Sequence, residues 1–237
     1  MKKMLLISNS TNYGEEYLSY CRPEIKKFLN SSVKEVLFVP FAGVTVTFDD
    51  YTAKVEKVFN ELGCQVKSIH NCENMIEAIN NAECIVVGGG NTFHLVHMLQ
   101  KTGAMKAIKD KVSIGTPFIG WSAGSNVACP SLKTTNDMPI IEPASFDCMN
   151  LVPFQINPHY TDYVQPNHGG ETRAQRIAEF LVANPTMKVV GLRESSMLLV
   201  NGETLKLIGE NSMCIFEHQK ATIDVTSNDN LDFLLQN

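Results

Sequence analysis

Short apolar runs alternate with longer amphipathic segments over the first half of the chain. The apolar runs are rich in Val and Ile, and they predict buried parallel strands at Met4–Ser8, Val36–Phe41, Cys64–Ile69, Cys84–Gly88 and Pro117–Trp121. Between them, apolar positions recur at the helical period, which predicts helices at Tyr13–Leu29, Asp50–Leu62, Glu73–Asn80 and Thr92–Gln100, with Gly63 as a C-cap. This alternation favours right-handed crossovers and a doubly wound, mostly parallel sheet flanked by helices, so the fold class is α/β.

The pattern changes after about residue 130. Five prolines punctuate a mostly irregular stretch, at Pro130, Pro139, Pro143, Pro153 and Pro158. One clear helix follows over Glu171–Ala183 and is ended by Asn184-Pro185. Short strands joined by hairpins are then predicted at Lys188–Leu192, Met197–Val200, Thr204–Ile208, Met213–Phe216 and Ala221–Val225, with Asn201-Gly202 as a strong turn signal. Because no repeat or flexible linker divides the chain, we expect a single α/β domain over residues 1–237 with a C-terminal β-rich portion.

Composition and charge exclude several functional classes. The 237 residues include 20 Lys and Arg against 25 Asp and Glu, a formal net charge of −5, which is the wrong sign for nucleic-acid binding. No apolar run approaches the roughly 18 residues of a membrane span, and the first run ends at Ser8, too early for a signal peptide. Seven scattered cysteines without a C-x-x-C pair argue against a disulfide framework or a zinc site. We therefore expect a cytoplasmic protein with no metal or other cofactor and no nucleic-acid or membrane partner.

A serine motif closes the fifth predicted strand. Gly120-Trp121-Ser122-Ala123-Gly124 fits the G-x-S-x-G nucleophile elbow, a sharp strand-to-helix turn that exposes the serine hydroxyl at its tip. The flanking glycines let neighbouring backbone approach, and the amide after the serine points at a developing oxyanion. The alternative is a glycine-bounded turn with an idle serine. Because open α/β sheets bind ligands at the carboxyl ends of their strands, we expect Ser122 to be a nucleophile.

Three consecutive glycines end the fourth predicted strand, in Val86-Val87-Gly88-Gly89-Gly90-Asn91-Thr92. Their amides could bind an anion at the positive end of the following helix. A phosphate site is one interpretation, but the segment has neither a G-x-G-x-x-G pattern nor a following Lys and Ser or Thr. A plain tight turn is another. We favour an oxyanion hole that completes the Ser122 site, with donors from Gly89 or Gly90 and from Ala123.

A serine nucleophile needs a neutral imidazole and a carboxylate that orients it. His159, in Asn157-Pro158-His159-Tyr160, follows an apolar segment and is the favoured base, although position alone does not exclude His70 or His168. Two carboxylates compete for the third place. Asp137 gives the chain order Ser, Asp, His, and Glu194 follows a predicted strand end. Either could instead be a helix-capping or turn carboxylate, and the spacing leaves the choice open.

Several motifs together resemble the peptidase E family of α-aspartyl dipeptidases, in order from about residue 4 to 216. The segments that carry the resemblance are Val39-Pro40-Phe41-Ala42-Gly43-Val44-Thr45, Gly88-Gly89-Gly90-Asn91-Thr92-Phe93, Gly120-Trp121-Ser122-Ala123-Gly124, Thr134-Thr135-Asn136-Asp137-Met138-Pro139-Ile140, Ile156-Asn157-Pro158-His159 and Gly170-Glu171-Thr172-Arg173. The resemblance implies a cytoplasmic serine peptidase, with a fold similar to class I glutamine amidotransferases, that hydrolyses dipeptides beginning with aspartate. An amidotransferase itself would need a cysteine at the elbow. The tail after Phe216 has no feature that the resemblance places.

The resemblance also implies roles for single residues. Ser122 matches the nucleophile, His159 the base and Asp137 the acid usually assigned, while Glu194 matches a carboxylate also proposed as the third member. Selectivity for an acidic first residue calls for a cation in the pocket, and Arg173 is the candidate, unless it is only a solvated helix arginine.

Three alternatives to this function stay open. A cyanophycinase-like hydrolase of the same framework would release aspartyl dipeptides from a branched polymer. An esterase of the α/β-hydrolase type would normally place its histidine near the C-terminus. A catalytically silent small-molecule binding module would keep only the turn geometry. Whichever holds, the sequence leaves the oligomeric state open, and the expected partner is a small peptide substrate.

Overall fold

The computed structural model describes residues 1–30, 32–164, 166–167 and 169–236. The strands are β1 Lys3–Ile7, β2 Glu35–Val39, β3 Gln65–Ser68, β4 Ile85–Val87, β5 Phe118–Trp121, β6 Gln155–Tyr160, β7 Lys188–Arg193, β8 Ser196–Asn201, β9 Thr204–Gly209, β10 Met213–Glu217 and β11 Ile223–Val225. The helices are α1 Arg22–Leu29, α2 Phe48–Glu61, α3 Met75–Asn81, α4 Thr92–Lys101, α5 Ala104–Ser113, α6 Ala123–Asn126 and α7 Arg173–Ala183, with short 3₁₀ turns η1 Ile69–Asn71 and η2 Asp232–Leu235. No helix within the described ranges has both the length and the apolar character needed to cross a bilayer.

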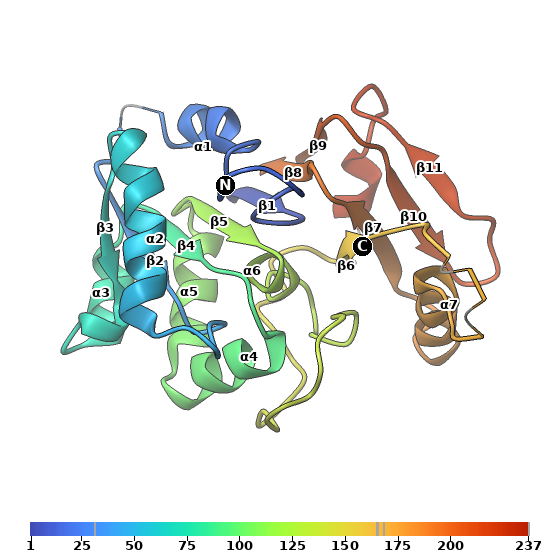
Figure 1. Cartoon of the computed structure of the whole chain (residues 1–237), viewed down its shortest axis with the longest axis horizontal. Helices are drawn as coiled ribbons and strands as arrows, with labels where there is room; N and C mark the ends of the chain where they lie inside the picture. Colours follow the sequence, from blue (N-terminus) through green and yellow to red (C-terminus); the bar gives the residue numbers. More distant parts are fainter. Residues whose placement is uncertain (31, 165, 168, 237) are drawn as a thin grey trace.

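Seven strands form the main sheet, in the order β3-β2-β4-β5-β1-β8-β9 (Figure 1). The first five are parallel, and β8 and β9 extend the sheet as antiparallel strands. The strand order reverses between β2 and β4, because β2 connects outward to β3 whereas β4 connects to β5 on its other side. Open α/β sheets bind ligands at such a reversal, outside the carboxyl ends of the strands.

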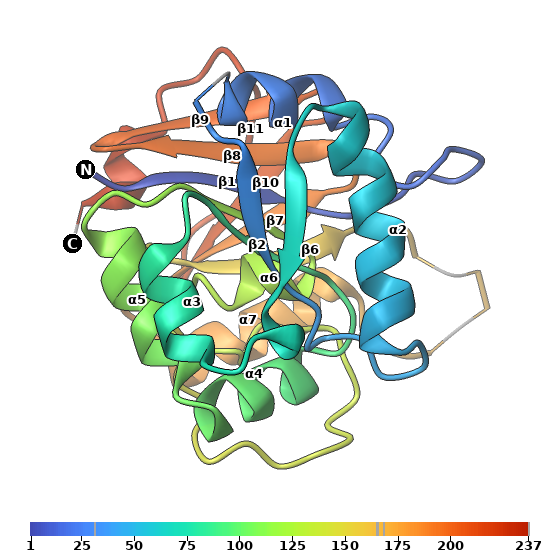
Figure 2. The same cartoon turned by 90° about the vertical axis from the view of Figure 1, so that its left-hand side faces the viewer.

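Helices cover both faces of the main sheet, which confirms the doubly wound α/β architecture. Alternate residues of β1 point to opposite faces, so Met4 and Leu6 join one buried cluster while Leu5 and Ile7 join the other. Helices α3, α4 and α5 pack on the first face, and α1 and α2 pack on the second. Figure 2 shows α2 and the pair α3 and α5 on opposite sides of β2. The sheet is therefore buried between two helical layers.

A second sheet lies beside the first, in the order β11-β10-β7-β6 (Figure 1). One of its faces, with Ile156 and Val190, shares the main core, and the other packs on α7 through Val189 and Phe216. The expected C-terminal β-rich portion is thus confirmed, but it is divided between the two sheets. The tail after Phe216 contributes β11 and η2.

One expected helix begins later than predicted, and two observed elements were not predicted. Helix α1 begins at Arg22 rather than near Tyr13, because Leu18 has a left-handed φ of 56° and Pro23 suits a first helical turn. Helix α5 has no counterpart among the predicted helices. Strand β6 was not predicted because it lies within the proline-punctuated stretch. Elsewhere the expected strands and helices agree with the structure to within a few residues, and Gly63, with φ of 83°, follows the end of α2 as expected.

Candidate active site

Ser122 occupies a strained turn between β5 and α6. Its φ of 54° and ψ of −114° lie outside the conformations that a side-chain-bearing residue normally adopts. Its amide donates to the carbonyl of Ile7 at 3.0 Å, which ties the turn to β1. The elbow geometry expected from the sequence is therefore present, with the hydroxyl at the carboxyl edge of the main sheet.

The two motif glycines make this turn possible. A Cβ on Gly120 would lie 2.3 Å from the carbonyl oxygen of Gly124. A Cβ on Gly124 would lie 2.1 Å from the carbonyl oxygen of Val87 in β4. Both contacts are with backbone, which cannot rotate away as a side chain can. The glycines thus allow α6 to pack directly over the ends of β4 and β5.

Substituting Gly124 with alanine is expected to lower the free energy of unfolding by about 2 kcal/mol or more, because overpacking here displaces a strand. Urea unfolding followed by circular dichroism measures the change. Gly169→Ala is the matched control, since no neighbouring atom among the described residues lies within 4 Å of its added methyl group. Equal stability of the two variants would contradict the packing argument.

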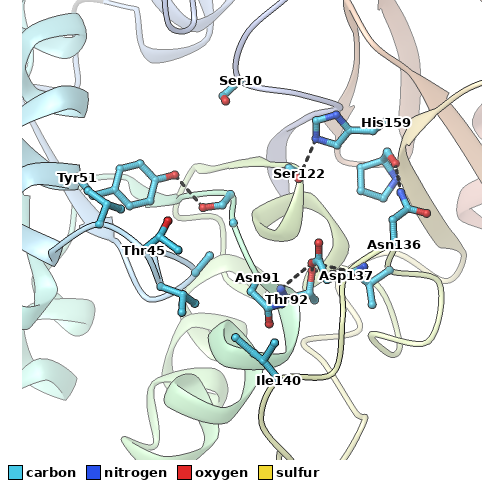
Figure 3. Close-up of a pocket in the computed structure, with 18 of the residues that line it drawn as sticks. Ser10, Thr45, Tyr51, Asn91, Thr92, Ser122, Asn136, Asp137, Ile140 and His159 are labelled. Atoms are coloured by element: carbon cyan, nitrogen blue, oxygen red, sulfur yellow. Dashed lines mark hydrogen bonds between the residues drawn. The ribbon is translucent and has the colours of Figure 1, made fainter.

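His159 links Ser122 with a carboxylate. Its Nε2 lies 3.0 Å from Ser122 Oγ, and its Nδ1 lies 2.7 Å from Glu194 Oε1 (Figure 3 shows the first contact). If the serine donates to Nε2, the ring proton sits on Nδ1 and is donated to the carboxylate. A hydroxyl, an imidazole and a carboxylate joined in this order can activate an oxygen nucleophile.

The second sheet positions the imidazole and its carboxylate. His159 has φ of 53° at a register shift of β6 against β7, and its amide donates to Ser8 Oγ at 2.9 Å. Glu194 follows β7 directly, and its carbonyl accepts from Asn211 Nδ2 at 2.8 Å. Because β6 and β7 are adjacent and parallel, their carboxyl ends bring the two side chains together. Glu194 thus follows a strand end, as the sequence predicted, and lies within hydrogen-bond distance of His159.

Asp137, the acid that the resemblance usually assigns, has no hydrogen bond to the imidazole among the described residues. Its Oδ2 accepts from the amide of Thr92 at 2.7 Å, from the Thr92 hydroxyl at 2.6 Å and from Thr135 Oγ1 at 2.9 Å. These donors hold the carboxylate at the N-terminus of α4, where the helix dipole favours a negative charge. Within the described part of the chain, the carboxylate hydrogen-bonded to His159 is that of Glu194.

The glycine run lies against the elbow. A Cβ on Gly89 would lie 3.0 Å from Ser122 Cβ, and Gly90 has φ of 136°, a region that favours glycine. In the described ranges, the amides of Gly89, Gly90 and Ala123 donate to no backbone carbonyl. The loop therefore presents uncommitted donors close to Ser122, as an oxyanion hole requires.

Arg173 is the first residue of α7 and lines the same cavity. Its Nη1 donates to Asn136 Oδ1, and no carboxylate of the described residues forms an ion pair with it. Burial lowers the pKa of this guanidinium, and the nearby charge of Arg176 lowers it further. A cation in the first helical turn also opposes the helix dipole. These unfavourable features indicate a site that a ligand anion would satisfy.

A cavity of about 920 Å³ lies in front of Ser122 and His159, at the strand reversal between β2 and β4 (Figure 3). The charged side chains of its described lining, apart from the imidazole, are Lys54, Asp137 and Arg173. Lys54 and Tyr51 come from α2 and were not considered from the sequence. Their i, i+3 spacing puts them on one face of the helix after β2, but the spacing alone does not indicate that this face meets the cavity.

His70, the other candidate histidine that the structure describes, is not at this site. His70 Nδ1 lies 2.6 Å from Ser68 Oγ and its Nε2 lies 2.9 Å from Asp49 Oδ1, so the ring is engaged beyond the end of β3. His168 lies outside the described residues. The imidazole in contact with Ser122 is that of His159.

An open α/β sheet with a serine, an imidazole and a carboxylate joined at its carboxyl edge is the architecture of a hydrolase. The chain belongs to peptidase family S51, whose model matches residues 4–208, and it is a peptidase. That match includes the whole elbow, the glycine run, His159 and Glu194.

Curated relatives agree over nearly the full length. Peptidase E of Nostoc sp. (strain PCC 7120) is 57% identical over 235 residues, covering 99% of this chain and 97% of that protein. Peptidase E of Shewanella sp. (strain MR-4) is 45% identical over 232 residues, covering 98% of each.

Solved structures show the same fold. A crystal structure of a peptidase E protein from Listeria monocytogenes EGD-e has a TM-score of 0.65 at 23% identity, covering 89% of this chain and 100% of that one. A peptidase from an acI-B1 Actinobacterium has a TM-score of 0.71 at 16% identity, covering 98% of this chain and 96% of that one. The fold expected from the resemblance to peptidase E is therefore confirmed.

Proposed function

We propose that the chain is a serine-type dipeptidase that hydrolyses dipeptides with an N-terminal aspartate through an acyl-enzyme intermediate. The joined hydroxyl, imidazole and carboxylate support the serine mechanism, and membership of family S51 supports peptide bonds as the target. The observation that supports an aspartyl dipeptide as the substrate is the pattern of charged side chains in the cavity lining.

The mechanism uses three side chains and the glycine loop. His159 Nε2 takes the Ser122 proton as the hydroxyl oxygen attacks the scissile carbonyl carbon. Amides of Gly90 and Ala123 bind the resulting oxyanion, and Glu194 stabilises the protonated imidazole. His159 then protonates the leaving amine, so that the C–N bond breaks and the aspartyl ester of Ser122 remains. Water, deprotonated by His159, hydrolyses this ester and releases aspartate.

The cavity lining complements the charges of such a dipeptide. An Asp-Xaa dipeptide with a neutral second side chain has one ammonium and two carboxylates at neutral pH. The described lining supplies one carboxylate, Asp137, and two cations, Lys54 and Arg173. The substrate's excess negative charge therefore meets an excess positive charge in the site.

Each charged group suits one end of the substrate. Arg173 has a planar fork that binds a carboxylate in a bidentate manner, which fits the aspartate side chain. Asp137 uses only Oδ2 in hydrogen bonds to described residues, so Oδ1 can accept from the substrate ammonium. Lys54, which lies on α2 and lines the cavity, suits the carboxylate of the second residue. This arrangement requires a free N-terminus and favours dipeptides.

Substituting Arg173 with methionine is expected to raise KM for Asp-Leu by about 10- to 100-fold, because the substrate carboxylate loses a charged partner. Hydrolysis of an aryl acetate, which has no such carboxylate, should change less than about threefold. Steady-state kinetics on both substrates measures the difference. Arg176→Met is the matched control, since Arg176 lies one turn along α7 outside this cavity lining. An equal rise of KM in both variants would contradict the assignment.

A substrate panel tests the function itself. Purified protein is incubated with Asp-Leu, Asn-Leu, Leu-Leu, N-acetyl-Asp-Leu and cyanophycin. We expect cleavage of Asp-Leu alone, because Asn-Leu lacks the side-chain charge and N-acetyl-Asp-Leu lacks the ammonium. Leu-Leu cleaved as fast as Asp-Leu would refute aspartate selectivity. Release of dipeptides from cyanophycin would favour the cyanophycinase alternative, and turnover of none of them would favour the binding module.

A further inference from the structure

Each glycine of the run Gly88-Gly89-Gly90 leaves room for a different neighbour. A Cβ on Gly88 would lie 2.5 Å from the hydroxyl oxygen of Tyr51. A Cβ on Gly89 would meet Ser122 Cβ at 3.0 Å, and one on Gly90 would meet the Ala42 carbonyl oxygen at 2.2 Å. The contacts of Gly89 and Gly90 place the glycine run against the elbow and against the loop that follows β2. The missing side chain of Gly88 lets the phenol of Tyr51 approach the backbone of the proposed oxyanion hole.

The Tyr51 hydroxyl joins the elbow strand to this loop. Its oxygen accepts from Trp121 Nε1 at 3.1 Å and from the Tyr17 hydroxyl at 3.4 Å, and it donates to the Gly89 carbonyl at 3.0 Å. The donation must run this way, because an indole nitrogen only donates and a carbonyl oxygen only accepts. Burial raises the pKa of Tyr51, so the hydroxyl keeps its proton at neutral and moderately alkaline pH.

This bond fixes the orientation of one peptide plane. The Gly89 carbonyl and the Gly90 N–H belong to the same trans peptide, in which the two groups point in opposite directions. Holding the carbonyl on Tyr51 therefore directs the Gly90 N–H away from α2. In the view of Figure 3, Ser122 lies on the side of the loop opposite to Tyr51. A peptide between two glycines has little steric resistance to rotation, so it needs such a restraint.

We propose that Tyr51 is a positioning residue that holds the Gly89–Gly90 peptide in one orientation. In that orientation the Gly90 N–H is directed at the oxyanion that forms when Ser122 attacks the substrate carbonyl. Tyr51 touches no reacting atom, and it acts through the peptide it restrains. The proposal rests on the proposed serine mechanism. It also gives Trp121 a role, since its indole N–H orients the phenol from within the elbow motif.

Tyr51→Phe tests the proposal with the ring retained. The phenyl ring keeps its edge contact with Phe38, at 5.2 Å between ring centroids, so the variant is expected to fold. Removing a single oxyanion donor typically lowers kcat by about 10²–10³-fold. In Tyr51→Phe the Gly90 N–H is still present but no longer held in place, so kcat should fall by about 10- to 100-fold. We expect that loss in kcat for Asp-Leu and a similar loss in the rate of Ser122 acetylation by an aryl acetate. KM and the inhibition constant of the product aspartate should change less than about twofold.

Tyr17→Phe is the matched control. Among the described residues its hydroxyl donates to Tyr51 and has no hydrogen bond to the glycine loop, so kcat should stay within about threefold of the unsubstituted chain. Thermal unfolding of all three proteins checks their folding. A stable Tyr51→Phe variant with unchanged kcat would overturn the proposal, and so would a loss that appears equally in aspartate binding, which reports a distorted pocket.

The outcomes also separate this proposal from the proposed function. If the unsubstituted chain does not cleave Asp-Leu but its Ser122 is acetylated, the substrate assignment fails. The acetylation rate of Tyr51→Phe then still decides the role of Tyr51. If the unsubstituted chain and Ser122→Ala react equally with both substrates, the serine mechanism fails and the positioning role fails with it.

Discussion

Ser122→Ala is expected to lower kcat for Asp-Leu by about 10⁴- to 10⁶-fold, because it removes the hydroxyl that His159 contacts and that forms the aspartyl ester in the proposed mechanism. KM should change little, since the charged groups that bind the substrate stay in place. Steady-state kinetics, with mass spectrometry of aryl-acetate-treated protein, measures both turnover and acylation. The unsubstituted chain should gain an acetyl group that the variant lacks.

Ser10→Ala is the matched control for that loss. Ser10 lies in the same cavity lining, but among the described residues the hydroxyl that contacts the imidazole is that of Ser122. We expect it to keep at least about a third of the activity. Retention of full activity by Ser122→Ala would exclude the serine mechanism, and a severe loss in Ser10→Ala would show that the cavity rather than the nucleophile had been damaged.

Glu194→Gln is expected to lower kcat by about 10³- to 10⁴-fold. The amide cannot stabilise the protonated imidazole, and its NH₂ group would favour the ring tautomer that cannot accept the serine proton. Acetylation of the serine by an aryl acetate should slow by a similar factor, because it needs the same proton transfer. Stopped-flow measurement of the acetylation burst isolates this step from substrate binding.

Asp137→Asn is the discriminating control for the same measurement. An aryl acetate has no ammonium for Asp137 to bind, and Asp137 has no hydrogen bond to the imidazole among the described residues. Acetylation should therefore stay within about threefold, while the free energy of unfolding falls by about 1 kcal/mol through the weakened interaction with α4. If acetylation were slowed in Asp137→Asn but not in Glu194→Gln, Asp137 would be the acid instead.

Local backbone requirements made parts of the site predictable from the sequence. The elbow of Ser122 and the glycine run each need a conformation or a close approach that only glycine permits. The glycines at these positions therefore make both features visible in the sequence. The strands predicted around them fixed the edge of the sheet where both would lie. His159 could be ranked above the other histidines only through its motif, because no local rule places it opposite the serine.

The remaining parts depend on tertiary contacts that leave no local record. The contact of His159 with Glu194 depends on the pairing of β6 with β7, and the prolines around β6 kept the sequence pattern from predicting that strand. Tyr51 and Lys54 reach the cavity because α2 docks beside the β2 loop, a placement that helical periodicity does not reveal. The helix expected from Tyr13 failed for a different reason, since its apolar period continues through the left-handed turn at Leu18.

The proposed reacting groups come from different sheets, so activity is expected to depend on how those sheets are joined. Ser122 follows a strand of the main sheet, whereas His159 and Glu194 end strands of the second. Ser8 Oγ bridges them, as it accepts from the His159 amide and donates to the Leu192 carbonyl at 2.8 Å. During refolding, the main sheet can regain its secondary structure before the second sheet docks, but the 3.0 Å contact between serine and imidazole cannot form until it does. Recovery of enzymatic turnover is therefore expected no earlier than the docking of the second sheet on the first.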